Sequence, residues 1–100
     1  MQNRDWKKAF DIKDNAAIRL NLALAYRDGS KFDLAKSSLK KAVKLRPRFS
    51  QAHFELAQLY IKENKKQKGK EHFKNVIVYS LGSEFAKQSK GYLKNIGQKN

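Results

Sequence analysis

The stretch "NLALAYRDG", residues 21–29, recurs in altered form as "ELAQLYIKE", residues 55–63, at an offset of 34 residues. Three pairs of residues are identical under this offset: Leu22 and Leu56, Ala23 and Ala57, and Tyr26 and Tyr60. Self-similarity at a fixed period of about 20 to 50 residues is the signature of repeat architectures. We therefore interpret the two stretches as two copies of one structural unit.

The same offset also relates apolar residues further along the chain. It places Leu39 on Phe73, Ala42 on Val76, Val43 on Ile77, and Leu45 on Tyr79. In both copies the apolar residues recur at the spacing of one helix face, so each copy is predicted to be two helices. In the first copy these cover about residues 15–27 and 32–45, before Pro47. In the second, one helix begins near residue 50 and the other ends near Gly82.

A fifth helix is predicted over about residues 83–96, with fewer apolar residues and several lysines. Asp14, Ser50 and Ser83 are expected to cap helix N-termini, because their side-chain oxygens can accept hydrogen bonds from free backbone amides. The predicted organisation is a single domain. It comprises an N-terminal arm or short helix (1–15), two repeats (16–49 and 50–83) and a capping helix (84–97).

The first copy resembles the tetratricopeptide repeat (TPR) family, a helix–turn–helix unit of this length. The family's characteristic positions hold Arg19, Leu22, Ala23, Tyr26, Ala35, Leu39, Ala42 and Pro47. In the second copy they hold His53, Leu56, Ala57, Tyr60, Gly69, Phe73, Val76 and Leu81. The resemblance implies an all-α fold in which antiparallel helix hairpins form an α-α superhelix. Arg19, His53 and Leu81 depart from the family pattern.

This packing assigns different roles to small and large residues. Ala23, Ala35, Ala57 and Gly69 are expected to let the helices of a pair approach closely. Large side chains are expected to fill the space between pairs: Leu22, Tyr26, Leu39, Leu56, Tyr60 and Phe73. Trp6, Phe10 and Ile12 are expected to cover the N-terminal end. The alternative is that they belong to a preceding repeat of a longer bacterial protein.

The formal net charge is +14, from 23 Lys and Arg against 9 Asp and Glu. Such a surface attracts anionic partners, whether nucleic acid, lipid or acidic protein. Two tracts carry the predicted basic surface, and no acid occurs between Leu34 and Phe54. The first tract is a row at four-residue spacing on one predicted helix, with Lys41 nearby, and the second is "KENKKQKGK", residues 62–70. The predicted basic surface consists of Lys36, Lys40, Lys44, Lys65, Lys66, Lys68 and Lys70. A merely solvated face is the alternative interpretation.

The residues offer no catalytic motif. The chain has no cysteine, no glycine-rich phosphate loop and no HExxH sequence, and His53 and His72 are its only histidines. We therefore expect no enzyme activity, no cofactor and no metal site. No apolar run is long enough for a transmembrane helix. The lack of cysteine leaves the compartment undetermined, although we favour the cytoplasm.

The family's geometry implies that the first helix of each repeat lines a concave face. The partner-binding residues it implies are Leu20, Asn21, Leu24, Arg27, Gln51, Phe54, Glu55, Gln58 and Lys62. Phe85, Gln88, Ser89 and Tyr92 could complete the wall. Leu20, Leu24 and Phe54 lie outside the expected core stripe, which makes them candidates for an apolar binding patch. Alternatively, they pack against the N-terminal residues or against further repeats.

The carboxylate clamp that some TPR proteins use for acidic chaperone tails is not expected here. It requires Lys and Asn where this chain has Leu20 and Leu24, or Phe54 and Gln58. The sequence therefore predicts a non-catalytic scaffold or adaptor whose concave face binds a protein or peptide, which could be acidic. Two alternatives remain open. One is a basic adaptor for nucleic acid or an anionic membrane surface, and the other is self-association through repeat stacking.

Overall fold

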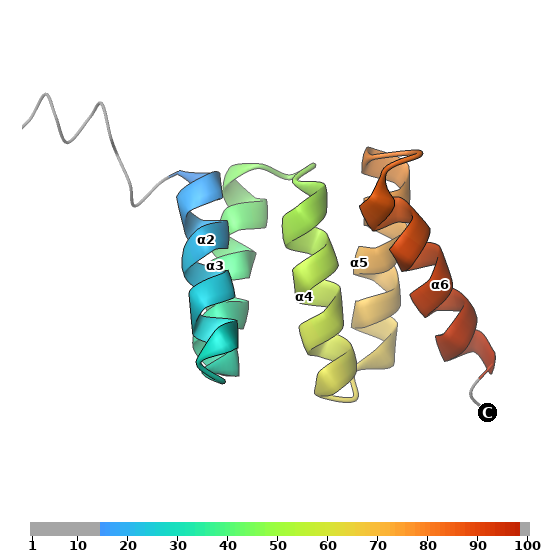
Figure 1. Ribbon diagram of the computed structural model, residues 1–100, viewed down its shortest axis with the longest axis horizontal. Helices are drawn as coiled ribbons and strands as arrows, with labels where there is room; N and C mark the ends of the chain where they lie inside the picture. The colour runs from blue at the N-terminus through green and yellow to red at the C-terminus, as the bar shows by residue number, and fades with distance from the viewer. Residues whose placement is uncertain (1–14, 99–100) are drawn as a thin grey trace, which may run out of the picture. The chain divides into compact units, whose positions relative to one another are not determined.

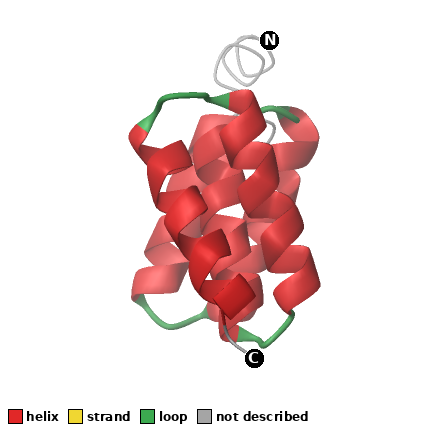
Figure 2. Cartoon of the chain, turned by 90° about the vertical axis from the view of Figure 1, so that its right-hand side faces the viewer, coloured by secondary structure: helices red, strands yellow, loops and turns green. Residues whose placement is uncertain are grey.

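The computed structural model describes residues 15–98, and every regular element within that range is an α-helix (Figure 1). Short turns join the helices within each unit (Figure 2). The chain divides into two compact units, Met1–Arg46 and Pro47–Asn100. No helix in the described range has the length and apolar character needed to cross a bilayer. The predicted all-α class and helix hairpins are thereby confirmed.

The first unit is a hairpin of helix α2 (Ala16–Asp28) and helix α3 (Phe32–Leu45). Ala23, Ala35 and Ala42 are almost fully buried, and these small side chains allow close contact between the two helices. Leu39 and Leu20 are the large buried residues of this unit, with 1% and 5% of their surfaces exposed. The bounds of α3 agree with the range predicted from sequence.

The second unit contains helix α4 (Ser50–Lys62), helix α5 (Lys66–Tyr79) and helix α6 (Glu84–Gln98). Its core is formed by Phe54, Ala57, Phe73 and Val76. Ile61 from α4 and Phe85, Leu93 and Ile96 from α6 pack against this core. Helix α6 therefore covers the apolar side of the α4–α5 hairpin, as expected of a capping helix.

The cap predictions have mixed outcomes. Helix α2 is capped by Asn15, whose Oδ1 accepts a hydrogen bond from the Ile18 amide at 3.1 Å, whereas Asp14 lies outside the described residues. The expected cap at Ser50 is wrong, because Phe49 occupies that position and makes no side-chain cap bond. Ser83 acts as predicted, since its Oγ accepts a bond from the Ala86 amide at 3.0 Å.

The turns within the two hairpins match bond for bond. The Lys31 amide donates to the Tyr26 carbonyl and the Lys65 amide to the Tyr60 carbonyl, both at 2.8 Å. Ser30 and Asn64 occupy equivalent places and are left-handed, with φ of 61° and 65°. Gly29, which the sequence suggested as the stop, has φ of −89° and is the C-cap. This shared turn supports the interpretation of two copies of one unit.

The predicted core is correct for most of its large residues. Leu39, Leu56, Tyr60 and Phe73 are buried. The prediction for Leu22 is wrong, because 40% of its surface is exposed, and Tyr26 is only partly buried. Trp6, Phe10 and Ile12, together with the rest of the expected N-terminal arm, lie outside the described residues.

Candidate functional site

The exposed side of α2 carries three of the residues predicted to bind a partner. Asn21, Leu24 and Arg27 are spaced by three residues and therefore share one face of the helix. Asn21 is exposed, whereas Leu24 and Arg27 are partly buried. The Arg27 guanidinium lies 3.3 Å from the Asp28 carboxylate. Leu20 does not belong to this exposed face. It is buried with 5% exposure, so the idea that it lies outside the core is wrong.

On α4 the corresponding residues divide between surface and interior. Gln51 and Gln58 are partly buried and Lys62 is exposed. Glu55 is buried, with 8% of its surface exposed. Gln58 Nε2 donates to the Tyr92 hydroxyl of α6 at 3.2 Å. The surface that α4 offers to a partner is therefore polar, and α6 occupies part of it.

Phe54 is a core residue rather than a binding residue. Its ring centroid lies 6.0 Å from that of Phe73, 5.3 Å from that of Phe85 and 6.0 Å from that of Tyr92. Phe73 and Tyr92 are themselves stacked at 4.8 Å. The prediction that Phe54 is free of the core is wrong, because helix α6 supplies the rings that bury it. Ser89 of α6 is fully buried as well, so it cannot line a binding wall.

A small apolar hollow lies in the second unit, with a volume of about 210 Å³. Residues from all three helices of the unit line it: Ile61, Lys66, Tyr92, Asn95 and Ile96. Periodicity within single helices could not have identified this hollow, because its walls come from elements far apart in the sequence.

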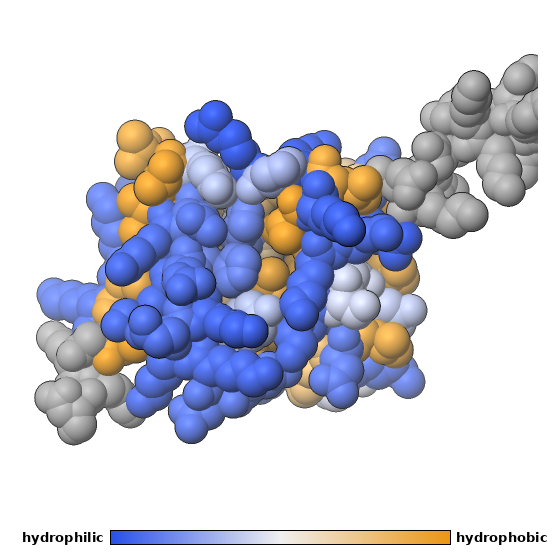
Figure 3. Space-filling view, turned by 180° about the vertical axis from the view of Figure 1, so that it is seen from behind, coloured by the Kyte–Doolittle hydropathy of each residue, from blue (hydrophilic) through white to orange (hydrophobic). Residues whose placement is uncertain are grey.

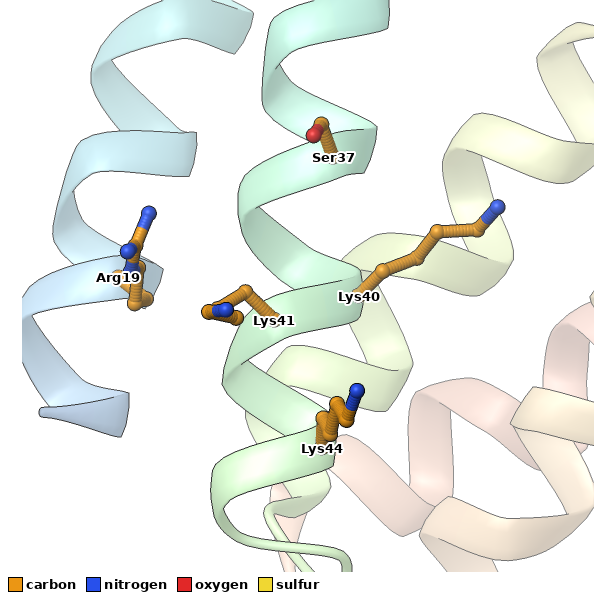
Figure 4. Close-up of a pocket in the computed structure, with 5 residues that line it drawn as sticks. All are labelled: Arg19, Ser37, Lys40, Lys41 and Lys44. Carbon is orange, nitrogen blue, oxygen red and sulfur yellow. The ribbon is translucent and has the colours of Figure 1, made fainter. Parts of the chain in front are cut away.

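A second hollow, of about 340 Å³, lies on the first unit and is lined mainly by cations. Arg19 comes from α2, and Ser37, Lys40, Lys41 and Lys44 come from α3. Figure 4 shows Lys41 directed toward α2, where Arg19 lies, and Lys40 directed to the opposite side of α3. Lys40 and Lys44 belong to the lysine row predicted from sequence, whereas Lys36 of that row is partly buried and does not line the hollow. The contribution of Arg19 was not predicted, since it depends on the packing of the hairpin.

The predicted lysines at the α4–α5 turn do not form a comparable site. Lys65 Nζ lies 3.6 Å from the Glu63 carboxylate, and Lys68 Nζ lies 5.6 Å from the centre of the Tyr60 ring. Lys66 borders the apolar hollow, and Lys70 is partly buried. These lysines therefore make separate local contacts and do not line a common hollow. Hydrophilic side chains nevertheless dominate the surface shown in Figure 3.

Comparison with known families agrees with the repeats seen in the fold. The model of the tetratricopeptide repeat matches residues 16–49 and 50–77. The chain belongs to the tetratricopeptide repeat family. No curated protein shows a significant sequence match to it. TPR units generally mediate protein–protein interaction, and the family is typically non-catalytic.

The second TPR unit also contains a pair of histidines in direct contact. His53 Nδ1 and His72 Nδ1 lie 2.8 Å apart, and His53 Nε2 lies 2.8 Å from the Pro47 carbonyl oxygen. Burial lowers the pKa of His53. Burial, His53 and Lys68 together lower the pKa of His72 to about 4. The Tyr79 ring packs against His53 with a centroid distance of 5.4 Å, and Arg48 lies over the same tyrosine ring.

This histidine pair does not extend to a metal centre. Among residues 15–98, no three His, Cys, Asp or Glu side chains are grouped so that they could hold a metal ion. Two histidine nitrogens beside Lys68 would bind a divalent cation poorly, because zinc sites require at least three protein ligands.

Proposed function

We propose that this TPR chain is a non-catalytic interaction module that binds a segment of a protein partner on the exposed face of helix α2. The observation that supports this most directly is Leu24, a partly exposed leucine with Asn21 and Arg27 on the same helix face. An apolar side chain beside an amide and a guanidinium combines the elements found in protein interfaces.

Helix α4 contributes less apolar contact in this proposal. Phe54 is committed to the core, and the side chains that remain at the surface, Gln51, Gln58 and Lys62, are polar. Polar contacts near an interface rim set specificity more than affinity. We therefore assign most of the binding energy to α2, with α4 giving hydrogen bonds to a partner's backbone or polar side chains.

The partner should include an apolar residue that packs against Leu24 and a hydrogen-bond acceptor for the Arg27 guanidinium. A peptide selected against the wild-type protein from a random displayed library provides a probe of this chemistry. Its affinity for a Leu24→Ser variant should be about tenfold weaker, since one apolar contact at an interface is worth about 1 to 2 kcal/mol. Fluorescence anisotropy measures the affinity, and circular dichroism melting verifies the fold.

Val78→Ser is the matched control. Val78 is an exposed β-branched residue on α5, with 63% of its surface accessible, and it lies on no predicted binding face. Peptide affinity should be unchanged in this variant. If Leu24→Ser and Val78→Ser bind the selected peptide equally well, or if no peptide can be selected, α2 is not the binding face.

A further inference from the structure

The outward face of helix α3 has a composition unlike that of an ordinary solvated helix. Ser37, Lys40, Lys41 and Lys44 lie at the i, i+3, i+4 and i+7 spacing of one broad helix face and line the cationic hollow together with Arg19. Within this face Lys41 is directed toward α2 and Lys40 away from it (Figure 4). None of these five residues is acidic. Asp33, the single acid of α3, lies one turn before Ser37 and does not line the hollow.

Two exposed leucines share this face with the lysines. Leu34 and Leu45 are 48% and 38% exposed. They stand seven residues before and four residues after Lys41, so at 3.6 residues per turn the three side chains form one stripe along the helix. The surface of α3 thus carries apolar contact points at both ends and a concentration of positive charge between them.

The equivalent face of the second repeat lacks this pattern. Shifted by 34 residues, Ser37, Lys40, Lys41 and Lys44 become Glu71, Lys74, Asn75 and Val78. Leu34 likewise becomes Lys68. Over these five positions, two lysines and one glutamate replace three lysines, so the formal charge falls from +3 to +1, even though both helices occupy the same place in their repeats. The repeat fold does not require the basic and apolar face of α3, which leaves that face available for binding.

We propose that this face of α3 is a docking surface for an acidic, amphipathic protein segment. Carboxylates of the partner pair with Lys40, Lys41 and Lys44, and one acidic side chain enters the hollow toward Arg19. Apolar residues of the partner cover Leu34 and Leu45. Charge complementarity directs the encounter, since positive potential steers an acidic partner and accelerates association. The surface is separate from that of α2, so the two proposals fail independently.

Nucleic acid and anionic membranes match the observations less well. A phosphate backbone gains nothing from Leu34 and Leu45, and proteins that hold single strands stack bases on aromatic rings. On α3 the aromatic residue is Phe32, partly buried at the start of the helix. A lipid surface would have to take up Leu34 and Leu45 together with Lys41, which lies between them on the same stripe, whereas helices that lie in a membrane interface keep their apolar and basic faces apart.

Anisotropy titrations with defined probes test the proposal on the full chain. The first probe is a labelled peptide built from repeats of Glu-Glu-Leu-Leu, and the second is a peptide of equal charge in which Ser replaces Leu. The third is an oligothymidylate of the same length, and the fourth is a phosphatidylcholine vesicle containing phosphatidylserine. We expect the Glu-Leu peptide to bind tightest of the four probes. Its affinity should decrease as added salt screens the charge of the lysines.

Two variants locate the binding to α3. The double variant Lys40→Glu with Lys44→Glu should bind the Glu-Leu peptide with an affinity about tenfold or more lower than that of the charge-matched control. The control is the double variant Lys74→Glu with Lys87→Glu. Leu34→Ser should weaken it by about threefold or more, and should leave the Glu-Ser peptide unaffected. Melting curves verify that all variants fold.

The proposal is overturned by any of three results. The first is an equal loss of affinity for the Glu-Leu peptide in the α3 lysine variant and in the charge-matched control. The second is an unchanged affinity of the Glu-Leu peptide for Leu34→Ser. The third is binding of oligothymidylate or vesicles as tight as that of the Glu-Leu peptide, which would assign the surface to nucleic acid or membrane.

Discussion

His53 and His72 share a hydrogen bond, with their Nδ1 atoms 2.8 Å apart across the α4–α5 hairpin. His53 Nε2 lies 2.8 Å from the Pro47 carbonyl oxygen, which can only accept, so Nε2 carries the proton. Neutral His53 therefore accepts at Nδ1, and His72 donates its Nδ1 proton. The Tyr60 ring stacks on His72 with a centroid distance of 5.5 Å and an interplanar angle of 17°. The pair is thus held in one tautomeric arrangement as long as both rings are neutral.

Acid should destabilise the second unit through this pair. The pKa of each histidine is lowered from about 6.5, and that of His72 reaches about 4. Between pH 6.5 and 4 the unfolded chain binds protons that the folded chain does not, so the free energy of unfolding decreases as pH falls and levels off below 4. Because His72 is half-buried and solvent screens its charge, we expect a loss of about 1 to 2 kcal/mol.

Urea unfolding followed by circular dichroism at several pH values measures this effect. His72→Gln is the matched variant, because the glutamine amide can still donate to His53 but does not titrate in this range. Its stability should change much less between pH 7 and pH 4. An equal pH dependence in wild type and variant would mean that the histidine pair is not its source.

The side chain of Ile61 leaves too little room for a Cβ atom at Gly69. A Cβ atom built at Gly69 would lie 2.5 Å from Ile61 Cδ1, 2.9 Å from its Cγ1 and 3.2 Å from the Ala57 carbonyl oxygen. Gly69→Ala should therefore lower stability by about 1 to 3 kcal/mol, despite the higher helix propensity of alanine. Thermal denaturation is the measurement.

A double-mutant cycle with Ile61→Ala separates crowding from other effects. Removing both Ile61 carbon atoms leaves only the Ala57 carbonyl oxygen at 3.2 Å, so Gly69→Ala should lower stability much less in that background and the two changes should not be additive. Additive losses would show that the glycine is needed for another reason. In the first repeat the equivalent positions hold Ala35 and Arg27, which is why the sequence alone did not reveal this pairing.

Periodicity recovered the helices because apolar residues recur at helical spacing in each of them, although α4 is buried on more than one face. The offset of 34 residues located both hairpins. Residue type identified the cap at Ser83 but failed at Ser50, where Phe49 is the N-cap. The roles of Phe54 and Leu20 could not be read this way. Whether an apolar residue on the first helix of a repeat is buried depends on what packs on that side, and for Phe54 it is helix α6 that supplies the rings.

Leu22 and Leu56 occupy the same repeat position but differ in burial, and their alanine variants should differ accordingly. Leu56 is 1% exposed and Leu22 is 40% exposed. Leu56→Ala should lower stability by about 2 to 5 kcal/mol, because it leaves a cavity in a packed core. Leu22→Ala should lower it by about 1 kcal/mol, since much of its surface already contacts water.

Chemical denaturation of both alanine variants tests this difference. Because the positions are related by the repeat, the comparison keeps residue type and helix position fixed while burial varies. Equal losses of stability would show that Leu22 is covered in solution as fully as Leu56.

Ser89 offers a stabilising substitution on helix α6. Its Oγ is buried and, within the described part of the chain, forms no hydrogen bond. A buried hydroxyl without a partner destabilises the folded state, so Ser89→Ala should raise stability by about 1 kcal/mol, helped by the helix propensity of alanine. Ser80→Ala is the opposite control, because Ser80 Oγ donates to the Val76 carbonyl at 2.8 Å and accepts from Ser83 Oγ at 3.0 Å. Ser80→Ala should lower the melting temperature. If Ser89→Ala also lowers the melting temperature, a bound water forms a hydrogen bond with the Ser89 hydroxyl.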